Sequence, residues 1–334
     1  MALSRLAFAS AIGVSTFLLG VASIDAASAN DRTSGDGLIQ ANVETDTVQF
    51  KSMEIDGLTV AYREAGDPSR PTILLLHGFP TSSHMFRELM PILAKKYHVL
   101  APDYPGYGAS DMPAMSDFEY SFASLAATMD KFVEAKGVNT FTLYAMDYGA
   151  PVGYRMFNDA PERVSGLIIQ NGNAYEEGLE TFWDPFKVFW ANPTDENAEP
   201  LRAFLEYDAQ VWQYTHGVPE AALSLVSPDN WHHDQFLLDR DGAKDIQVQL
   251  FKSYGTNVPE YANWQEKFRK HQPPALIVWG KNDHIFPPAG AYPYLRDLED
   301  VEMHMLDAGH FVLETHLDFV ADEILDFMAR EVSA

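Results

Sequence analysis

The sequence predicts an α/β fold, with a mostly parallel twisted sheet, helices on both faces and a helical insertion. One observation is that short apolar runs, bounded by turn residues, alternate with segments of helical periodicity. Another is that this alternation stops between about Asn173 and Gln272, where helical periodicity, many aromatics and several Pro and Gly breakers follow. With 46% hydrophobic residues, the 334-residue chain can bury a large core.

The first predicted elements are a hairpin and two buried strands. The hairpin runs from Val48 to Gly66 and turns at Asp56-Gly57. Buried strands are predicted over Pro71–Leu76 and Tyr97–Pro102. Between them, capping hydroxyls open a predicted helix over Ser82–Ala94.

The later elements alternate strictly up to the insertion and resume after it. They are predicted as helix Phe122–Lys136, strand Thr140–Met146, helix Gly149–Asp159, strand Val164–Gln170, strands Ala275–Trp279 and Val301–Leu306, and helix Phe319–Val332. We therefore divide the folded part into a core, residues 48–172 and 273–334, and a helical cap, residues 173–272.

The N-terminus carries a predicted export signal. Arg5 precedes an apolar run from about Leu6 to Ile24, and Ala27-Ser28-Ala29 forms an A-x-A cleavage site. Residues 1–29 are accordingly predicted to be a signal peptide and residues 30–47 a flexible leader, so the mature protein is expected in the periplasm or secreted. An uncleaved membrane anchor is the alternative, because the run is close to spanning length.

The charge balance limits the possible partners. A net charge of -25 repels phosphate backbones and anionic lipid surfaces, so we expect no nucleic-acid partner and no membrane association after signal cleavage. The acidic residues are scattered, which is typical of a soluble surface. The chain has no cysteine, which excludes disulfides and thiolate chemistry. Nothing in the sequence specifies an oligomeric state.

The most informative peptide places Asp147 where a buried strand turns into a helix. Ala145 and Gly149 are the small residues on either side that such a sharp turn requires, as in a nucleophile elbow. The helix that follows directs its N-terminal dipole at the carboxylate. Taken alone, an aspartate at this place is more typical of a simple helix N-cap.

Three other peptides strengthen the catalytic interpretation. His77-Gly78-Phe79-Pro80 follows an earlier strand, where an oxyanion-hole N–H is expected. Asp283 and His310 each follow a late strand. Because ligands bind at the carboxyl ends of parallel strands, Asp147, Asp283 and His310 are predicted to meet there.

These motifs resemble the α/β-hydrolase superfamily, in particular its branch of epoxide hydrolases and haloalkane dehalogenases. The resemblance covers nearly the whole chain from about residue 48, and the insertion matches that branch's helical cap. It implies that Asp147 attacks a saturated carbon and that His310, oriented by Asp283, activates water. The backbone N–H groups of Phe79 and Tyr148 would form the oxyanion hole. Some dehalogenases carry their acid at the position of Asn171, which cannot serve, so Asp283 is the available acid.

The residues around the nucleophile depart from the usual halide site. Haloalkane dehalogenases carry Trp directly after the nucleophile, whereas this chain has Tyr148, and Phe79 stands at the second halide-binding position. The Arg of fluoroacetate dehalogenases is absent too. Tryptophans of the cap remain as possible N–H donors, namely Trp183, Trp190, Trp212 and Trp231.

Epoxide hydrolases instead use cap tyrosines to donate to the ring oxygen. Tyr254 falls close to one family position, and its partner is sought among Tyr175, Tyr207 and Tyr214, with Tyr175 and Tyr214 retained. Aromatic packing is the alternative for each of them. Trp183, Trp212 and Asn171 are candidate substrate contacts, although the segment around Asn171 is equally consistent with a hinge.

The sequence thus predicts a cofactor-free hydrolase acting on a small apolar substrate, first of all an epoxide. A dehalogenase with an altered halide site and a non-catalytic binding protein on the same scaffold are the alternatives. No phosphate loop or dinucleotide fingerprint occurs. His232-His233 lacks the spacing of a metal site, so we expect no metal.

Overall fold

A computed structural model describes residues 45–332. The predicted signal peptide and all but the end of the predicted leader lie outside the described residues, so export stays a prediction. Among the residues described, no helix has both the length and the apolar character needed to cross a membrane.

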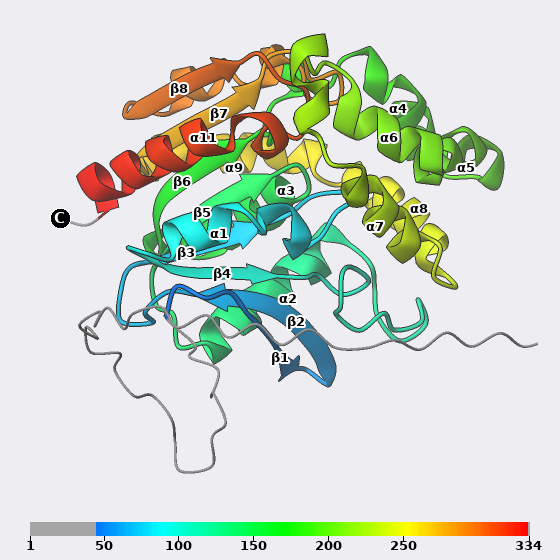
Figure 1. Ribbon diagram of the computed structural model, residues 1–334. Helices are drawn as coiled ribbons and strands as arrows, with labels where there is room; N and C mark the ends of the chain where they lie inside the picture. Colours follow the sequence, from blue (N-terminus) through cyan, green and yellow to red (C-terminus); the bar gives the residue numbers. More distant parts are fainter. Residues whose placement is uncertain (1–44, 333–334) are drawn as a thin grey trace, which may run out of the picture. The chain divides into compact units, whose positions relative to one another are not determined.

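The core is one eight-stranded sheet in the order β1-β2-β4-β3-β5-β6-β7-β8 (Figure 1). The strands are β1 Gln49–Ile55, β2 Leu58–Ala65, β3 Thr72–Leu76, β4 His98–Pro102, β5 Phe141–Met146, β6 Val164–Gln170, β7 Ala275–Gly280 and β8 Val301–Leu306. β2 pairs antiparallel with β1 and β4, and all other pairs are parallel. The predicted α/β fold with a mostly parallel sheet is confirmed.

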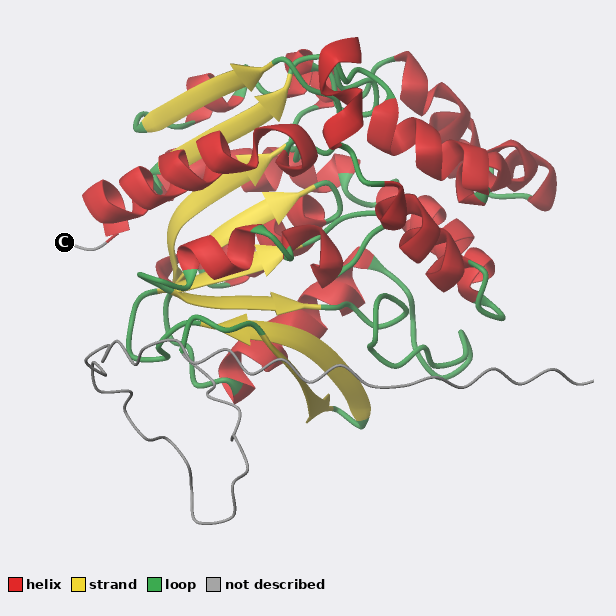
Figure 2. Ribbon diagram, in the orientation of Figure 1, coloured by secondary structure: helices red, strands yellow, loops and turns green. Residues whose placement is uncertain are grey.

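Helices cover both faces of this sheet (Figure 2). The α-helices are α1 Leu89–Leu93, α2 Phe122–Ala135, α3 Gly149–Asp159, α4 Asp184–Ala191, α5 Asp195–Arg202, α6 Tyr207–Thr215, α7 Pro228–Leu238, α8 Ala243–Tyr254, α9 Tyr261–His271, α10 Tyr294–Asp297 and α11 Leu313–Phe327. Along β3, Leu74 and Leu76 join one apolar cluster with residues of α2 and α3. Ile73 and Leu75 join a second cluster with residues of α1 and α11. Burial on both faces explains the continuous apolar runs in the sequence.

Two helices differ from their predicted bounds. The run Ser82–Ala94 divides into a 3₁₀ turn, η1 (Ser83–Phe86), and α1. Pro91 explains the break, because it has no N–H to continue a helical hydrogen-bond ladder from the preceding turn. The last helix begins at Leu313 rather than Phe319, with non-helical backbone at His316.

The insertion between β6 and β7 forms a helical layer at the carboxyl end of the parallel strands (Figure 1). α4 to α8 make up this layer, which we call the lid. α9 behaves differently, since Trp264 and Phe268 pack their rings against Tyr154 and Phe157 of α3. We therefore use the name lid for the helices before Tyr261 and count α9 with the core, whereas the predicted cap included residues up to 272.

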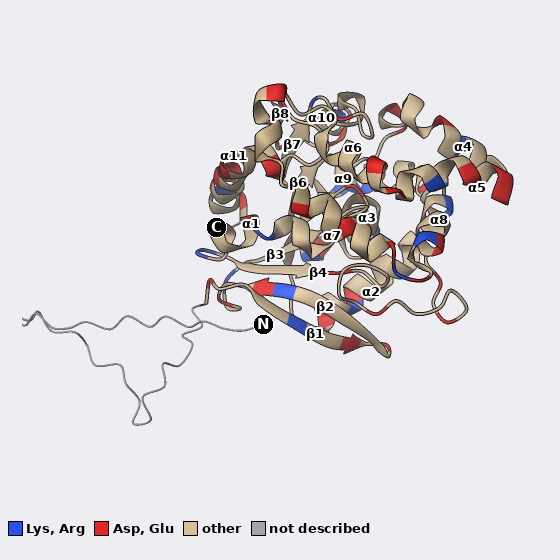
Figure 3. Ribbon diagram, turned by 45° about the vertical axis from the view of Figure 1, so that its right-hand side comes forward, with Lys and Arg blue, Asp and Glu red and all other residues tan. Residues whose placement is uncertain are grey.

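Charged residues are distributed over many elements. Asp and Glu occur on α5, α11 and β1, with Lys and Arg between them (Figure 3). Within the lid, Arg202 pairs with Asp245 at 3.0 Å and Lys244 with Glu206 at 2.9 Å. Exposed pairs of this kind contribute about 0–1 kcal/mol each, so the lid depends mainly on its apolar contacts.

Asp103 ties together two loops at the carboxyl end of the sheet. It follows β4, is 5% exposed, and its two carboxylate oxygens accept the backbone N–H groups of Ser83 at 2.8 Å and Ala109 at 2.9 Å. Ser83 begins the turn after the His77–Pro80 loop, so Asp103 helps to hold that loop.

We expect Asp103→Ala to lower the free energy of unfolding by about 2–4 kcal/mol, because it leaves the buried N–H of Ser83 and the partly buried N–H of Ala109 without acceptors. Urea unfolding followed by circular dichroism measures the change. Asp103→Asn keeps one acceptor and is expected to lose less. Equal losses in the two variants would contradict this account.

Candidate active site

Asp147 lies at a strained turn between β5 and α3. Its backbone φ is 51°, a left-handed conformation that costs energy for any residue with a side chain. A Cβ added at the following Gly149 would lie 2.2 Å from the carbonyl oxygen of Leu76, so only glycine allows this close approach. Tyr148, not Asp147, occupies the N-cap position of α3, and no side chain caps that helix. The structure therefore does not show the alternative role of Asp147 as a helix cap.

The carboxylate of Asp147 is held by backbone donors from two loops. Its Oδ1 accepts the N–H of Phe79 at 2.7 Å, and the N–H of Tyr148 also donates to the carboxylate. A Cβ at Gly78 would lie only 2.3 Å from the Cβ of Asp147. The two N–H groups predicted for an oxyanion hole thus both lie at the Asp147 carboxylate.

His77 organises the loop that supplies the Phe79 donor. Its buried ring lies 4.2 Å from that of Tyr104, and its Nε2 accepts the Tyr104 N–H at 3.4 Å. The Tyr104 hydroxyl donates in turn to the carbonyl of His77 at 3.0 Å. Burial lowers the pKa of His77, which keeps the ring neutral and able to accept. These contacts account for the presence of His77 at the start of the His77–Pro80 motif.

His310 stands between the two aspartates. Its Nδ1 lies 2.8 Å from Oδ2 of Asp283, and its Nε2 lies 3.8 Å from Oδ2 of Asp147. An ionised carboxylate only accepts hydrogen bonds, so in neutral His310 the proton belongs on Nδ1. Nε2 is buried and has no hydrogen-bond partner among the described residues. It is therefore available to take a proton from a water molecule.

Asn171 orients Asp283 and does not line the pocket. Its Nδ2 donates to Oδ2 of Asp283 at 2.7 Å, and its Oδ1 accepts the N–H of Gly280 at 3.0 Å. The N–H of Ile285 donates to the other oxygen of Asp283 at 2.8 Å. The predicted substrate contact at Asn171 is thus replaced by a positioning role near His310.

Burial and charge act in opposite directions on these groups. Burial raises the pKa of Asp147 to about 6, against the lowering effects of His310 and of the N–H groups of Phe79 and Tyr148. Burial alone would lower the pKa of His310, but the nearby carboxylates of Asp283 and Asp147 outweigh it and raise that pKa. At pH 8 Asp147 is ionised inside an apolar setting, as a nucleophile requires.

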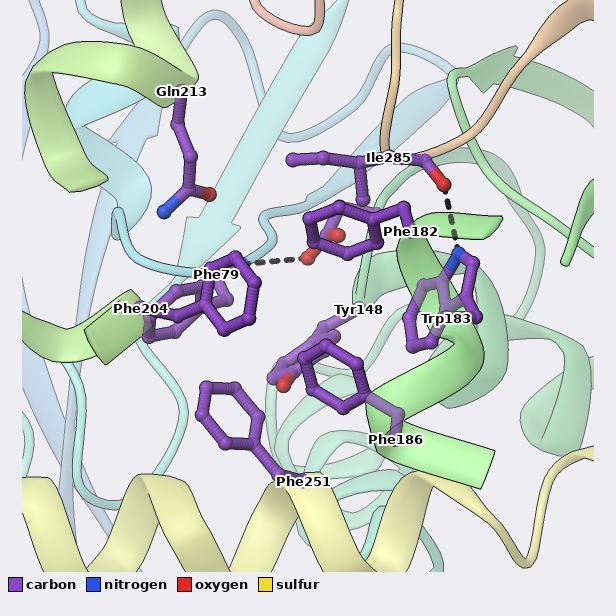
Figure 4. A pocket seen from close by; sticks show the side chains of 10 residues that line it. Phe79, Tyr148, Phe182, Trp183, Phe186, Phe204, Gln213, Phe251 and Ile285 are labelled. Atoms are coloured by element: carbon purple, nitrogen blue, oxygen red, sulfur yellow. Dashed lines mark hydrogen bonds between the residues drawn. The ribbon is translucent and has the colours of Figure 1, made fainter. Parts of the chain in front are cut away.

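A small apolar cavity of about 30 Å³ adjoins Asp147. Most of its walls are aromatic side chains from the core and the lid (Figure 4). The lining residues are Phe79, Asp147, Tyr148, Phe182, Trp183, Phe186, Phe204, Gln213, Phe251 and Ile285. This volume holds one or two water molecules. A larger occupant requires the phenylalanine rings to move.

Of the candidate tryptophans, only Trp183 lines the cavity, and its N–H is engaged. It donates to the carbonyl of Ile285 at 2.7 Å (Figure 4). Trp190 donates to Phe251 at 2.8 Å and Trp231 to Tyr207 at 3.1 Å. Trp212 stacks behind Phe182, with ring centroids 6.1 Å apart. The expected indole donors are therefore either bonded elsewhere or outside the cavity.

The three predicted tyrosine donors do not line the cavity either. Tyr254 stacks on Trp183 at 4.5 Å, and its buried hydroxyl lies near that of Tyr261 without forming a hydrogen bond among the described residues. Tyr175 is buried against Tyr294. Tyr214 donates to Asp234 at 2.6 Å. These placements correct the predicted donor roles, and aromatic packing or internal hydrogen bonding explains all three residues.

The sequence missed most of the lid's contribution to the cavity. Phe182, Phe186, Phe204, Phe251 and Gln213 were not singled out, because aromatic residues are frequent throughout the insertion. The helical period of α8 identifies its inner face but not which ring of that face reaches Asp147. The sequence also assigned Tyr148 only a backbone role, although its side chain lines the cavity.

One cluster in the described part of the chain has metal-ligand geometry. The side chains of Glu302, His304 and Glu323, on β8 and α11, place their ligand atoms within 4.8 Å of one another. None of the three lines the cavity, and Glu302 also pairs with Arg330. An ion-pair network accounts for the cluster.

Sequence comparisons relate the chain to hydrolases. A family model described as alpha/beta hydrolase fold matches residues 71–317. The uncharacterized hydrolase YNR064C of Saccharomyces cerevisiae is 43% identical over 84% of this chain and 98% of its own length. A haloalkane dehalogenase of Mesorhizobium japonicum is 37% identical over 83% of this chain and 90% of its own.

A solved structure has a similar fold. Cfl2 from Burkholderia cenocepacia superposes with a TM-score of 0.70 at 26% identity. The match covers 84% of this chain and 95% of that protein.

We expect Asp147→Asn to stabilise the protein at pH 8. Folding raises the pKa of this carboxyl, so the ionised form is less favourable in the folded protein than in the unfolded chain. The protonated carboxyl costs no stability below the unfolded pKa of about 4, and stability is lost as pH rises through about 6 and the group ionises. The rise of the Asp147 pKa from 3.8 to about 6 corresponds to a loss of about 3 kcal/mol in the free energy of unfolding. The neutral amide of Asp147→Asn does not cause this loss.

Urea unfolding of both proteins between pH 4 and pH 8 measures this difference. The stability gained by Asp147→Asn over the parent should be smallest near pH 4 and grow through pH 6. A variant less stable than the parent at every pH would contradict the prediction. Asp307→Asn, at an exposed aspartate, serves as the control and should show no such growth.

Proposed function

The chain belongs to the α/β-hydrolase superfamily, and we propose that it hydrolyses a small uncharged alkyl compound through an ester on Asp147. The observation that carries this proposal is the position of Oδ1 of Asp147, 2.7 Å from the N–H of Phe79. In a serine hydrolase, the oxyanion hole receives an oxygen of the substrate. Here an oxygen of the enzyme's own side chain occupies it, which fits chemistry in which that side chain becomes the acyl group.

In the first step, Oδ2 of Asp147 attacks a saturated carbon and the bond from that carbon to the leaving group breaks. The product is an alkyl ester whose carbonyl oxygen is Oδ1, already held by the N–H of Phe79. Because Asp147 is buried, little water must be removed from the nucleophile when the substrate arrives.

In the second step, His310 removes a proton from water through Nε2, and the hydroxide adds to Cγ of Asp147. The negative charge that develops on Oδ1 is stabilised by the N–H groups of Phe79 and Tyr148. Collapse breaks the ester bond, and the departing alkoxide takes the proton from His310. Asp147 is left as a carboxylic acid, which then loses its proton.

The cavity supports an uncharged substrate. Asp147 is its one charged lining residue, and no lysine or arginine is among the ten. A substrate carboxylate would meet no cation there and would be repelled by Asp147. Haloacids are therefore disfavoured, and compact apolar molecules fit the aromatic walls.

Carbon–halogen cleavage is the first candidate reaction. Its support is the Mesorhizobium relative, which is named a haloalkane dehalogenase and is 37% identical. A halide leaves as a stable anion and requires hydrogen-bond donors but no proton. Net hydrolysis then yields an alcohol, a halide ion and a proton.

Epoxide ring opening is the second candidate. The observation that favours it is the lining itself: the N–H of Trp183 is engaged by Ile285, whereas a tyrosine hydroxyl, that of Tyr148, borders the cavity. A phenol can give a proton to a basic alkoxide, which an indole N–H cannot do.

We expect His310→Gln to trap the ester. With the base removed, alkylation of Asp147 proceeds and its hydrolysis stops, so the protein gains the mass of the alkyl group. Incubation with butyl bromide or butene oxide, followed by intact-mass and peptide mass spectrometry, detects the adduct and locates it on Asp147.

The double variant His310→Gln/Asp147→Asn is the control and should gain no mass. Halide release from butyl bromide and diol formation from butene oxide by the wild type distinguish the two leaving groups. An unmodified His310→Gln protein after exposure to both compounds would rule out the ester mechanism.

The two steps are expected to differ in pH dependence. Alkylation needs ionised Asp147, so its rate should fall as pH drops through about 6. Ester hydrolysis needs neutral His310. Esterification removes the negative charge of Asp147, which is one cause of the raised His310 pKa, so that pKa should be lower in the ester than in the free enzyme.

Quenched-flow mass spectrometry in single turnovers separates the two rates between pH 5 and pH 9. A pH-independent alkylation rate across that range would contradict the assignment of Asp147 as the attacking group.

A further inference from the structure

The polar groups that border the cavity differ in their availability. The indole N–H of Trp183 donates to Ile285 at 2.7 Å, and the amide of Gln213 donates to Gln210 at 3.3 Å. Asp147 is an acceptor when ionised. The hydroxyl of Tyr148 makes no hydrogen bond within the described part of the chain, and it is not among the fully enclosed unpartnered atoms. Among the side-chain donor groups that line the cavity, it is therefore the one that makes no hydrogen bond within the described residues.

Aromatic contacts hold the Tyr148 ring in place. Its centroid lies 4.8 Å from that of Phe122 at 87°, 5.9 Å from Tyr254 and 6.0 Å from Phe79. In Figure 4 the hydroxyl of this ring is directed toward the rings of Phe186 and Phe251. A donor fixed by packing loses little entropy when it meets its acceptor.

The hydroxyl also stays protonated over the working pH range. Burial raises the pKa of Tyr148 well above its usual value, and the nearby Tyr107 and Asp147 act in the same direction. Tyr148 is consequently a neutral donor at any pH at which Asp147 is ionised.

We propose that the hydroxyl of Tyr148 donates a hydrogen bond to the leaving atom of the substrate, and its proton when that atom is the oxygen of an epoxide. This assignment rests on the proposed function of Asp147 as the attacking group. It transfers the donor role from the lid tyrosines to the residue that directly follows the nucleophile.

For an epoxide, the atoms balance as follows. The bond from Oδ2 of Asp147 to carbon forms, the ring carbon–oxygen bond breaks, and the ring oxygen takes the proton of Tyr148. After hydrolysis, the carboxyl proton left on Asp147 by the attacking water passes through solvent to the Tyr148 phenolate. The net reaction consumes one water molecule and yields a diol.

Tyr148 thus serves the two steps with two different groups. Its hydroxyl acts while the carbon–leaving group bond breaks, whereas its backbone N–H stabilises the oxyanion of ester hydrolysis. Tyr148→Phe removes the first group and keeps the second, together with the ring contacts. Alkylation should therefore slow while ester hydrolysis stays unchanged, a split that a purely structural role does not produce.

The test compares His310→Gln with His310→Gln/Tyr148→Phe by time-resolved mass spectrometry of the Asp147 adduct. With butene oxide, we expect alkylation to slow by about 10²-fold or more, as for loss of a general acid. With butyl bromide, we expect about a tenfold loss, typical of one hydrogen bond. Single turnovers of Tyr148→Phe with intact His310 should show ester decay within about twofold of the wild type, as the unchanged N–H requires.

Tyr254→Phe is the matched control, because its hydroxyl lies outside the cavity without a hydrogen bond. It should leave both rates unchanged. If alkylation of His310→Gln/Tyr148→Phe stayed within twofold of His310→Gln, the role of Tyr148 would be overturned while the proposed function would stand. Equal slowing of both steps in Tyr148→Phe would have the same consequence. Absence of any adduct in His310→Gln itself would overturn the proposed function, and this inference with it.

Discussion

The hydrogen bond from the Phe79 N–H to Oδ1 of Asp147 is the constraint on which the rest of the site depends. It joins residues from two loops, and β3 and β5 bring those loops together by pairing Leu76 with Ala145. The approach is so close that Gly78 has no room for a Cβ. It also requires the left-handed backbone of Asp147, whose strain the surrounding sheet and helix must support. A continuous buried sheet is therefore a condition of the chemistry as well as of the fold.

Holding a carboxylate in this place works against stability. Burial destabilises the ionised form of Asp147, while two N–H groups and the imidazole of His310 offset part of that cost. A site that offset the cost completely would bind the charge too well, and the oxygen would be a weaker nucleophile. The pKa of about 6 is a compromise, since the group is ionised at neutral pH yet incompletely stabilised.

The sequence predicted those features that depend on neighbours along the chain. The strand ends at Met146 and Leu306 follow from apolar runs closed by turn residues, and the predicted end at Trp279 is one residue before that of β7. Chain order brings Asp147, Asp283 and His310 to one edge of the sheet. Features that depend on packing between distant segments were not predictable. Tyr254 has a suitable spacing, but its hydroxyl faces Tyr261, because Trp183 stacks on its ring. Asn171 was predicted to contact the substrate, yet it holds Asp283, and only the register of β6 and β7 shows this.

Ile285 connects the lid to the catalytic groups of the core. Its carbonyl accepts the N–H of Trp183 from the lid, and its N–H donates to the Asp283 carboxylate that orients His310. The cavity of about 30 Å³ is too small for a substrate of several heavy atoms, so entry requires the lid's aromatic rings to move. Without the Trp183–Ile285 bond, Asp283 would still be held by the side chain of Asn171 and the N–H of Ile285. The rings that must move for entry are thus separate from the contacts that align Asp283 with His310, and in the closed arrangement those rings keep water from Asp147.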